Sequence, residues 1–332
     1  MPDADPLALL LLALAVDAYG GGFGLLPDAA GRLRRFVGFL DRKLNRPQRP
    51  EGDRAFRGAV VVVILVVPAI VAGALVWAGR LLFAYGWVLE LVVLVMLLDA
   101  RRLFDGGRAV GRALRDQGVD PARLALRPLV PWETVHLDGH GVARGAVEAL
   151  AVGFGERVVA PVFWYALLGL PGLAAHRVLA VTAEGIGHPT DAHRAFGAAA
   201  RRLHALAALV PARLAGLILA LAALFVPTAR PLAALGTVVR QARHYAGPGP
   251  GWTVAAAAGA LHLCLGGPRP LAAQKVKTPW LGDGRARATP QDVRRMLFLY
   301  AVGGLITAAL AAVLLILRMG GRFTLLPLVS GA

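Results

Sequence analysis

Apolar stretches long enough to form membrane helices alternate along the chain with short polar segments. A helix needs about 20 residues to cross the hydrocarbon core of a bilayer, and Gly58–Gly79, Leu81–Leu98 and Leu297–Leu317 each supply roughly that length. The first two meet at Gly79–Arg80, which predicts a tight helical hairpin. Leu203–Val226 is a fourth candidate span, although a proline and an arginine interrupt it.

Two further apolar segments are shorter than a span. Leu7–Val16 follows two aspartates and lacks a basic n-region, so we interpret it as a retained first membrane segment rather than a signal peptide. Val158–Leu170 contains Pro161 and runs into a Gly-Leu-Pro-Gly turn. A re-entrant or interfacial helix is predicted there, because irregular backbone inside a bilayer must be surrounded by protein or line a wet cavity.

Composition and charge agree with a membrane protein. The chain is 57% hydrophobic and only 17% charged, whereas a soluble domain carries about 25% charged residues. The net charge is +16, and Lys and Arg gather between the apolar spans, at Arg32–Arg57, Arg101–Arg144 and Arg230–Arg295. The positive-inside rule places these loops on the cytoplasmic face of the inner (plasma) membrane. The predicted fold is an all-α, polytopic integral membrane protein, residues 1–332 forming a single domain with about four to six transmembrane helices and amphipathic or re-entrant helices.

The excess of basic residues also bears on binding partners. Nucleic acid is not expected, because no basic stripe is interleaved with aromatic residues. Membrane lipid and a phosphate-bearing small molecule are the expected partners, since arginine side chains bind phosphate groups. The single cysteine, Cys264, excludes an intramolecular disulfide and a thiolate metal cluster.

Ionisable residues just before Val158–Leu170 are the strongest candidates for chemistry. Arg144 and Glu148 lie four residues apart and share a helix face, and Glu156 follows eight residues later. Ionisable groups beside a membrane-entering segment suggest function, although a helix-stabilising ion pair is the alternative. The histidines match no compact ligand spacing, and we interpret these five as loop or interface residues: His136, His140, His188, His193 and His204.

Further polar residues follow in the second half of the chain. Arg202 and Arg213 stand near Pro211, where their guanidinium groups could hold a phosphate through bidentate contacts or extend to lipid headgroups. Trp252, Lys277 and Asp283 lie in Pro/Gly-rich stretches that are predicted to form ordered loops at the membrane interface.

Several motifs occur in a fixed order: LDRKLNRP near residue 44, RGAVEA at 144–149, RVVAPVFWYALLGLPG at 157–172, FGAAARRLHALAALVPARL at 196–214, GPGPGWTVAAAAGAL at 247–261, and KTPWLGDG at 277–284. In this order they resemble the adenosylcobinamide-phosphate synthase family of cobalamin biosynthesis (CobD/CbiB) over nearly the whole chain.

The resemblance implies a ligase reaction, the ATP-dependent joining of adenosylcobyric acid to an aminopropanol phosphate. It implies Mg²⁺ and ATP as cofactors, and a corrinoid, a phosphate-bearing small molecule and other cobalamin-pathway proteins as partners. In that reaction Glu148 and Glu156 would serve metal binding or acid–base catalysis. The implied substrate and phosphate contacts are Arg144, Arg202, Arg213, Lys277, Asp283 and Trp252.

The chain departs from the family's pattern at several polar positions. Val152 and Gly153 stand where the family typically has Glu-Asn, and Ala180–Ala183 replaces an Asn-Thr-Leu-Asp run. Glu156 replaces an aspartate, and His204 replaces the first aspartate of an Arg-Leu-Asp-Asp run. Alanine, glycine and valine side chains can neither bind Mg²⁺ nor transfer protons.

Two function hypotheses therefore stand together. In the first, the protein is a cobalamin-pathway enzyme that binds corrinoid or its phosphate-bearing partner at the membrane face. In the second, it is a non-catalytic homologue that serves as a membrane scaffold, partner subunit or regulator. A transporter is a third reading, but the chain lacks the charged midplane residues and paired broken helices of transporters.

Overall fold

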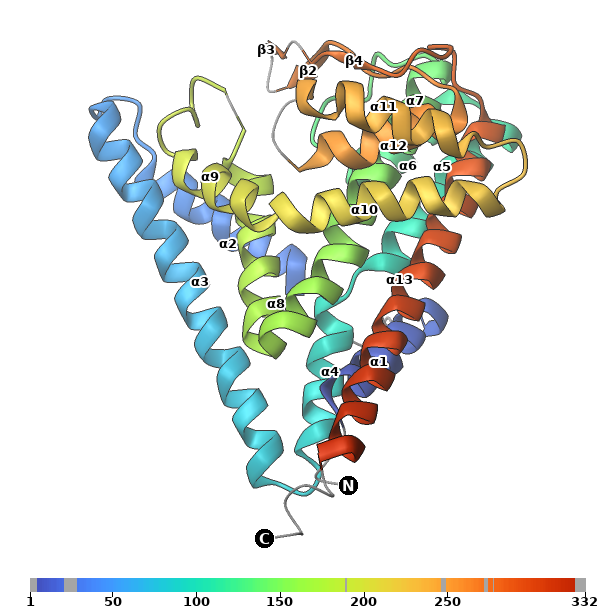
Figure 1. The fold of residues 1–332 in the computed structure, drawn as a ribbon. Helices are drawn as coiled ribbons and strands as arrows, with labels where there is room; N and C mark the ends of the chain where they lie inside the picture. The colour runs from blue at the N-terminus through green and yellow to red at the C-terminus, as the bar shows by residue number, and fades with distance from the viewer. Residues whose placement is uncertain are drawn as a thin grey trace, which may run out of the picture.

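Two long helices outline a wedge that is wide at one end and narrow at the other (Figure 1). The computed structural model describes residues 5–20, 29–188, 190–245, 249–271, 274–276 and 278–325. Helices α3 (Glu51–Leu82) and α13 (Pro290–Leu325) run from the wide end to the narrow end and contain the predicted spans 58–79 and 297–317. Acidic residues in the first turn of α3 complement its helix dipole.

At the narrow end, α1 (Pro6–Gly20) and α4 (Gly86–Leu97) complete the frame. The turn after α3 comes later than the predicted Gly79–Arg80. Arg80 stays in the last turn of α3, where its Nη1 lies 3.1 Å from Oε2 of the buried Glu90. Because α4 has only 12 residues, it is about 18 Å long, shorter than the predicted span Leu81–Leu98.

The wide end holds the remaining helices and a few short strands. The helices are α2 (Ala29–Leu44), α5 (Ala100–Asp116), α6 (Val119–Leu126), η1 (Arg127–Leu129), α7 (Gly139–Phe154), η2 (Gly155–Val159), α8 (Ala160–Ile186), α9 (Ala198–Ala207), α10 (Leu209–Ala222), η3 (Ala223–Phe225), α11 (Pro231–Gln241), η4 (Ala242–His244) and α12 (Pro250–Leu261). Strand β1 (Leu265–Gly266) pairs with β4 (Trp280–Leu281), and β2 (Arg269–Leu271) pairs with β3 (Gln274–Val276), both antiparallel.

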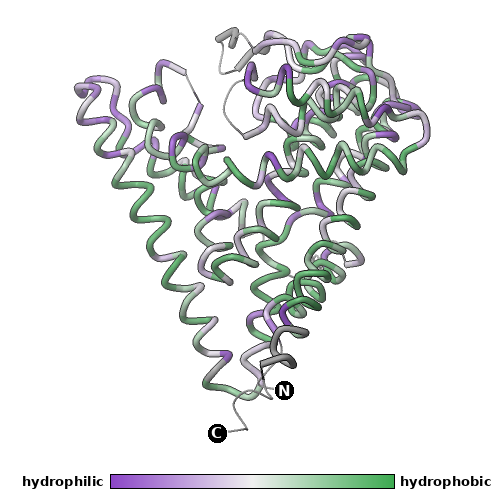
Figure 2. Tube along the Cα trace, in the orientation of Figure 1, coloured by the Kyte–Doolittle hydropathy of each residue, from purple (hydrophilic) through white to green (hydrophobic). Residues whose placement is uncertain are grey.

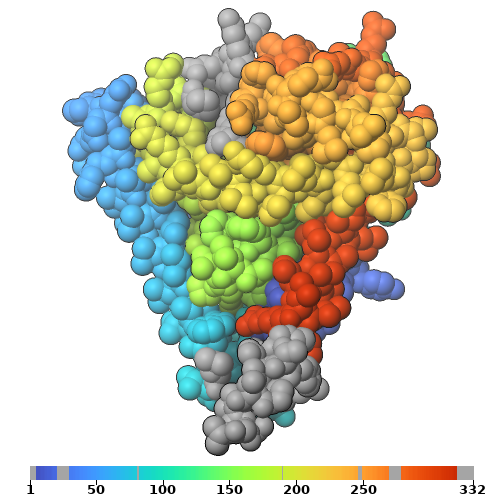
Figure 3. All heavy atoms as spheres, in the orientation of Figure 1, coloured from blue at the N-terminus to red at the C-terminus, as the bar shows by residue number. Residues whose placement is uncertain are grey.

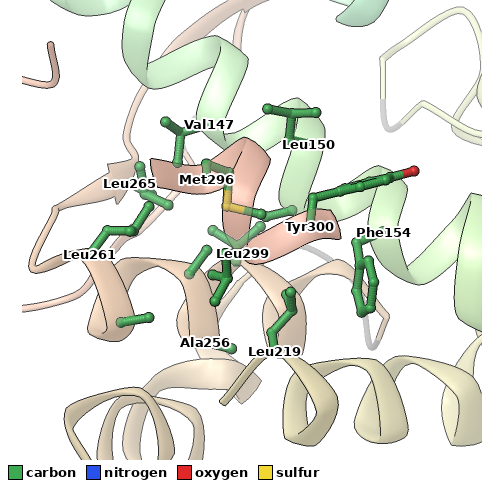
Figure 4. Packing of buried hydrophobic residues seen from close by; sticks show 14 of the residues in the cluster. Val147, Leu150, Phe154, Leu219, Ala256, Leu261, Leu265, Met296, Leu299 and Tyr300 are labelled. Atoms are coloured by element: carbon green, nitrogen blue, oxygen red, sulfur yellow. The ribbon is translucent and has the colours of Figure 1, made fainter. Parts of the chain in front are cut away.

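The largest hydrophobic core lies at this wide end, between α7, α10, α12 and α13. Figure 4 shows Phe154 of α7 beside Tyr300 of α13, with Leu219 of α10 below them. The two rings meet edge to face, with centroids 5.5 Å apart, an arrangement that aromatic quadrupoles favour. The Tyr300 hydroxyl donates to the Ala100 carbonyl at 3.0 Å, so the buried phenol is satisfied. This core fixes α7, which carries Glu148.

The chain reverses direction inside α8. Gly169 has φ 66° and ψ −158°, a conformation that is essentially confined to glycine. On a straight helix Arg157 and Arg177 would lie about 30 Å apart, yet their guanidinium nitrogens lie 2.7 and 3.8 Å from the same oxygen of Asp99. The segment therefore forms a helical hairpin, with Gly169 at its apex.

This α8 hairpin occupies the space between α3 and α13, below α10 (Figures 1 and 3). Gly73 of α3 lies against its apex, since a Cβ at Gly73 would lie 2.9 Å from the Pro171 Cα. Although Gly139–Ile186 is long and apolar enough for a span, the reversal returns the chain to the wide end. The hairpin has the form predicted for a re-entrant segment at 158–170, and its insertion into a bilayer stays a prediction.

The predicted span Leu203–Val226 is divided between two helices. Helix α9 and the helix that begins at Leu209 are bent by 51° relative to each other. The bend has a local cause: Pro211 has no N–H to donate to the Ala207 carbonyl. The indole Nε1 of Trp164 donates to that carbonyl instead, at 3.2 Å, and ties the bend to the α8 hairpin.

Apolar residues dominate the frame helices, whereas polar residues gather at the wide end (Figure 2). A soluble protein rarely exposes so large an apolar surface. Large apolar side chains are exposed on α3 at Val63, Ile64, Val67, Ile70, Val71 and Leu75, and on α13 at Leu305, Leu310, Val313, Leu314, Ile316 and Leu317. Within the described residues, three helices, or four if the bent pair is one span, are long and apolar enough to cross a membrane. The predicted all-α polytopic membrane fold is confirmed.

Candidate functional site

The candidate site lies beside the π-helical turn η2, which joins α7 to α8. Asp138 caps the start of α7, and its side chain accepts from the Gly141 N–H at 2.7 Å. Helix α7 continues through the π-helical turn η2 into α8. Such turns add a residue to a helix and occur often at functional sites. Glu148 of α7 and Glu156 of η2 both line one cavity of about 440 Å³. This volume is typical of small-molecule sites.

The cavity wall combines residues from distant parts of the chain. Its polar side chains come from Arg34 of α2, Arg157 of η2, Glu184 of α8 and His188 just beyond it. Burial lowers the pKa of the His188 imidazole, because desolvation disfavours the cation. His188 is therefore neutral near pH 7 and offers the cavity a hydrogen-bonding nitrogen.

Glu148 is held in place by hydrogen bonds from two other elements. Its side chain is only 2% exposed. One carboxylate oxygen accepts from the Tyr245 hydroxyl, and the other accepts from the backbone N–H of Gly266 in β1 at 3.3 Å. These contacts orient the carboxylate and connect α7 with the end of η4, through Tyr245, and with β1, through Gly266.

Glu156 lies among two histidines that the α8 hairpin and the α9 bend bring to it. Its Oε2 lies 2.9 Å from Nε2 of His204 and 3.7 Å from Nε2 of the buried His176. One ligand-type atom from each of the three residues lies within 4.8 Å of the others. His204 was interpreted as a loop or interface histidine, and the loop assignment is wrong, because this residue lies on α9 and pairs with Glu156.

A buried charge cluster supports the same region. Asp99 lies between α4 and α5. Its Oδ2 accepts a hydrogen bond from Arg157 Nη1 at 2.7 Å and lies 3.8 Å from Arg177 Nη2. All three side chains are largely buried. Because one carboxylate serves two guanidinium groups, this cluster leaves a positive potential beside Glu156.

The other predicted site residues lie away from this cavity. Arg144 donates to the Ala286 carbonyl at 2.9 Å and lies over the Trp280 ring at 5.1 Å. Asp283 is exposed and accepts from Arg240 at 3.1 Å. They form a polar surface at the wide end, and neither lines the cavity.

The remaining predicted contacts are also separate. The Arg213 guanidinium lies 4.8 Å from the Trp252 ring centroid, so these two form a cation–π pair. Arg202 is exposed on α9. Lys277 lies outside the described residues. Of the predicted site residues that the structure describes, only Glu148 and Glu156 share the cavity.

Sequence reasoning missed several cavity residues, among them Arg34, Glu184 and Tyr245, and it missed His176. Their separation in sequence hid them, because only the folded chain brings α2 and both arms of the α8 hairpin to one wall. The Gly-Leu-Pro-Gly turn was a usable signal for a reversal near Gly169. A hairpin with its apex there places position 176 nearest to position 162, so this signal would not have identified the contact between His176 and Glu156.

Comparisons with known proteins identify the family. The family model described as CobD/Cbib protein matches residues 10–300. A protein from Sinorhizobium sp, named cobalamin biosynthesis protein CobD, is 37% identical over 300 residues, which cover 86% of this chain and 91% of that protein. Proteins of the same name from Brucella suis biovar 1 and Rhodobacter capsulatus are each 35% identical, covering 89% and 88% of this chain and 92% of each relative. No solved structure matches the chain. The match spans most of the sequence, and the chain belongs to the CobD/Cbib protein family.

Proposed function

We propose that this protein acts in cobalamin biosynthesis as a membrane enzyme that resembles adenosylcobinamide-phosphate synthase and joins a corrinoid carboxylate to an aminopropanol phosphate. The proposal is supported by the names of its relatives, each of which aligns over most of its length. The observation that carries it is the cavity that Glu148 and Glu156 share with Arg34 and Arg157. Carboxylates and guanidinium groups around one small-molecule cavity suit a phosphate-bearing amine.

Amide formation requires a base and a phosphate-binding group, and the cavity residues would supply both. In ATP-dependent amide formation a phosphoryl group of ATP passes to a carboxylate oxygen, and the amine nitrogen then attacks the activated carbonyl while phosphate leaves. The attacking amine must lose a proton, which a positioned base accepts. Glu148 would be that base, because the Tyr245 hydroxyl and the Gly266 N–H fix its orientation. Arg34, whose Nε lies 3.7 Å from the half-exposed Glu184, is free to turn towards a phosphate.

The residues present fit the Mg²⁺ of an Mg-ATP complex. Mg²⁺ prefers oxygen ligands and is usually held by one or two carboxylates together with substrate phosphates. Glu184 supplies a carboxylate on the cavity wall and would hold it together with the substrate phosphates. When bound, Mg²⁺ neutralises phosphate charge. The corrinoid is too large for the cavity, so only its reacting carboxylate would enter.

Turnover by the purified protein tests the proposal. Protein in detergent would be given adenosylcobyric acid, aminopropanol phosphate and Mg-ATP, and the amide product measured by mass spectrometry. Glu148→Gln should lower the rate by about 10²–10⁴-fold, the usual contribution of a general base. Glu51→Gln, at an exposed glutamate of α3, is the matched control. Equal rates in wild type and Glu148→Gln would refute the assignment of Glu148.

A specific observation keeps the non-catalytic alternative in view. Val152 and Gly153, which stand where the family typically has Glu-Asn, both line the cavity. A scaffold, partner subunit or regulator would retain corrinoid binding without turnover. Measurable corrinoid binding with no product at any ATP concentration would therefore favour this alternative over the enzyme.

We also propose that the wide end of the wedge faces the cytoplasm across the inner membrane. The support is the clustering of Arg and Lys at that end and the apolar surface of the frame helices. In a Cys264→Ser background, Gln117→Cys places a thiol at an exposed wide-end position. An impermeant maleimide should label it only after cells are permeabilised; labelling in intact cells would reverse the orientation.

A further inference from the structure

His176 is a buried side chain whose hydrogen-bonding groups are unsatisfied. It is 2% exposed, and neither ring nitrogen has a hydrogen-bond partner among the described residues. Its Nε2 is 3.7 Å from Glu156 Oε2, beyond hydrogen-bonding range. Buried polar atoms without partners are rare in folded proteins, because each forfeits its hydration. A ligand that His176 could bind is therefore a natural explanation for its position.

The surroundings of His176 resemble a set of metal ligands. Glu156 comes from the π-helical turn, His176 from the second arm of the α8 hairpin and His204 from α9. One ligand-type atom from each lies within 4.8 Å of the others. A metal ion with ligands at about 2.0–2.2 Å needs its ligand atoms only slightly over 3 Å apart. The observed separations of 2.9 and 3.7 Å from Glu156 Oε2 bracket that spacing.

We propose that Glu156, His176 and His204 form a binding site for a divalent transition-metal ion of the Zn²⁺ class. Two imidazoles and one carboxylate are a common protein donor set for such ions. Mg²⁺ does not fit these three residues, because it prefers oxygen ligands in an octahedral arrangement. The site is therefore distinct from the Mg²⁺ position proposed above, and it does not depend on the reaction proposed there.

A metal ion bound by Glu156, His176 and His204 would be accessible to a ligand in the cavity. Three protein ligands leave a fourth coordination position open, as in catalytic rather than structural zinc sites. Glu156 also lines the 440 Å³ cavity and a second, small recess beside Gly249 and Pro250. A metal held by Glu156 would therefore lie at the cavity wall, within reach of an oxygen or nitrogen ligand that enters it.

The same residues without a metal would form a different arrangement. His204 would carry a proton and pair with Glu156 at 2.9 Å, while His176 kept its unsatisfied nitrogens. The metal arrangement satisfies all three side chains at once and releases the His204 proton on binding. Arg157 and Arg177 add positive charge nearby, which Asp99 offsets only in part.

Metal content distinguishes the two arrangements without reference to turnover. The full chain, purified in detergent with a histidine-free tag, would be equilibrated with Zn²⁺ in excess Mg²⁺, desalted and analysed by mass spectrometry for metals. We expect roughly one zinc per wild-type chain, and about tenfold less in His176→Ala and His204→Ala. His136→Ala removes an exposed histidine outside the trio and should retain the wild-type content.

Two further measurements make the result decisive. Replacing zinc by Co²⁺ should give visible absorption bands of a four-coordinate ion in wild type and His136→Ala but not in Glu156→Gln. Gel filtration in metal-free buffer would verify that each variant is folded. The proposal is overturned if wild type retains no more zinc than His204→Ala, if His136→Ala loses zinc equally, or if Mg²⁺ displaces the zinc. The wild-type content alone decides the question should a variant not fold.

Discussion

Replacing Gly169 by alanine should destabilise the protein through the backbone alone. Gly169 forms the apex of the α8 hairpin with φ 66° and ψ −158°, a region that residues with a Cβ avoid at a cost of about 1–3 kcal/mol. A Cβ added there would meet only the Pro171 Cδ at 3.8 Å, an ordinary contact. Side-chain clash therefore adds nothing, and Gly169→Ala should lower Tm by a few degrees for a protein of this size.

Gly79→Ala is the matched control for this substitution. Gly79 lies in helical backbone near the end of α3, and a Cβ there would meet no heavy atom within 4 Å. Alanine is favoured over glycine inside a helix by about 1 kcal/mol, so this variant should be as stable as wild type or slightly more so. Thermal unfolding in detergent, followed by tryptophan fluorescence, measures both. If the two variants unfold at the same temperature, Gly169 is not the strained apex of a hairpin.

Substitutions at three further positions test polar contacts that are wholly or partly buried. Tyr165→Phe removes the hydroxyl that donates to Glu90 Oε1 at 2.7 Å and should cost about 1.5–3 kcal/mol of unfolding free energy, as for a bond to a charged group; an SDS unfolding titration measures it. Asp99→Asn removes the buried charge that faces Arg157 and should cost about 3–5 kcal/mol, seen as lower folded yield, whereas Asp99→Glu should recover part of it. Burial opposes ionisation of Asp41, but hydrogen bonds from a histidine and an asparagine outweigh it and lower its pKa. That contribution is present above the unfolded pKa of about 3.9 and is lost as pH falls through the folded value, so Asp41→Asn should be less stable than wild type at pH 6 and should converge with it in acid.

The long apolar helices could be predicted because their lengths follow from the thickness of a bilayer. Gly58–Gly79 and Leu297–Leu317 are apolar over their whole length, and both lie inside α3 and α13. The turn after α3 was predicted too early, because an arginine beside a glycine is a normal loop signal. The burial of Arg80 inside the last turn of α3 depends on Glu90, a tertiary partner ten residues later.

The finer geometry of the site depends on contacts that no local pattern records. The π-helical turn at Gly155–Val159 has no sequence signature, and the bend at Ala208 became stable only because Trp164 occupies the carbonyl that Pro211 leaves unpaired. Glu148 and Glu156 were predicted from their place beside the apolar segment, and both line the cavity. Arg34 could not be predicted, because it reaches the cavity from a helix more than a hundred residues away in sequence.

Four of the departures from the family's pattern lie in or beside one cavity. Val152 and Gly153, where polar side chains are missing, line the cavity on the face of α7 that leads to Glu156. Glu156 and His204, which both stand where the pattern has aspartate, are in contact at 2.9 Å. Random loss of function would not be expected to place a new imidazole against a lengthened carboxylate, with a second histidine beside them. These substitutions are better explained as a site rebuilt around nitrogen ligands: oxygen donors are lost on one side of Glu156, and one imidazole donor, His204, is gained on the other. Metal content tests this explanation directly, whereas the turnover assay separates an active enzyme from a non-catalytic homologue.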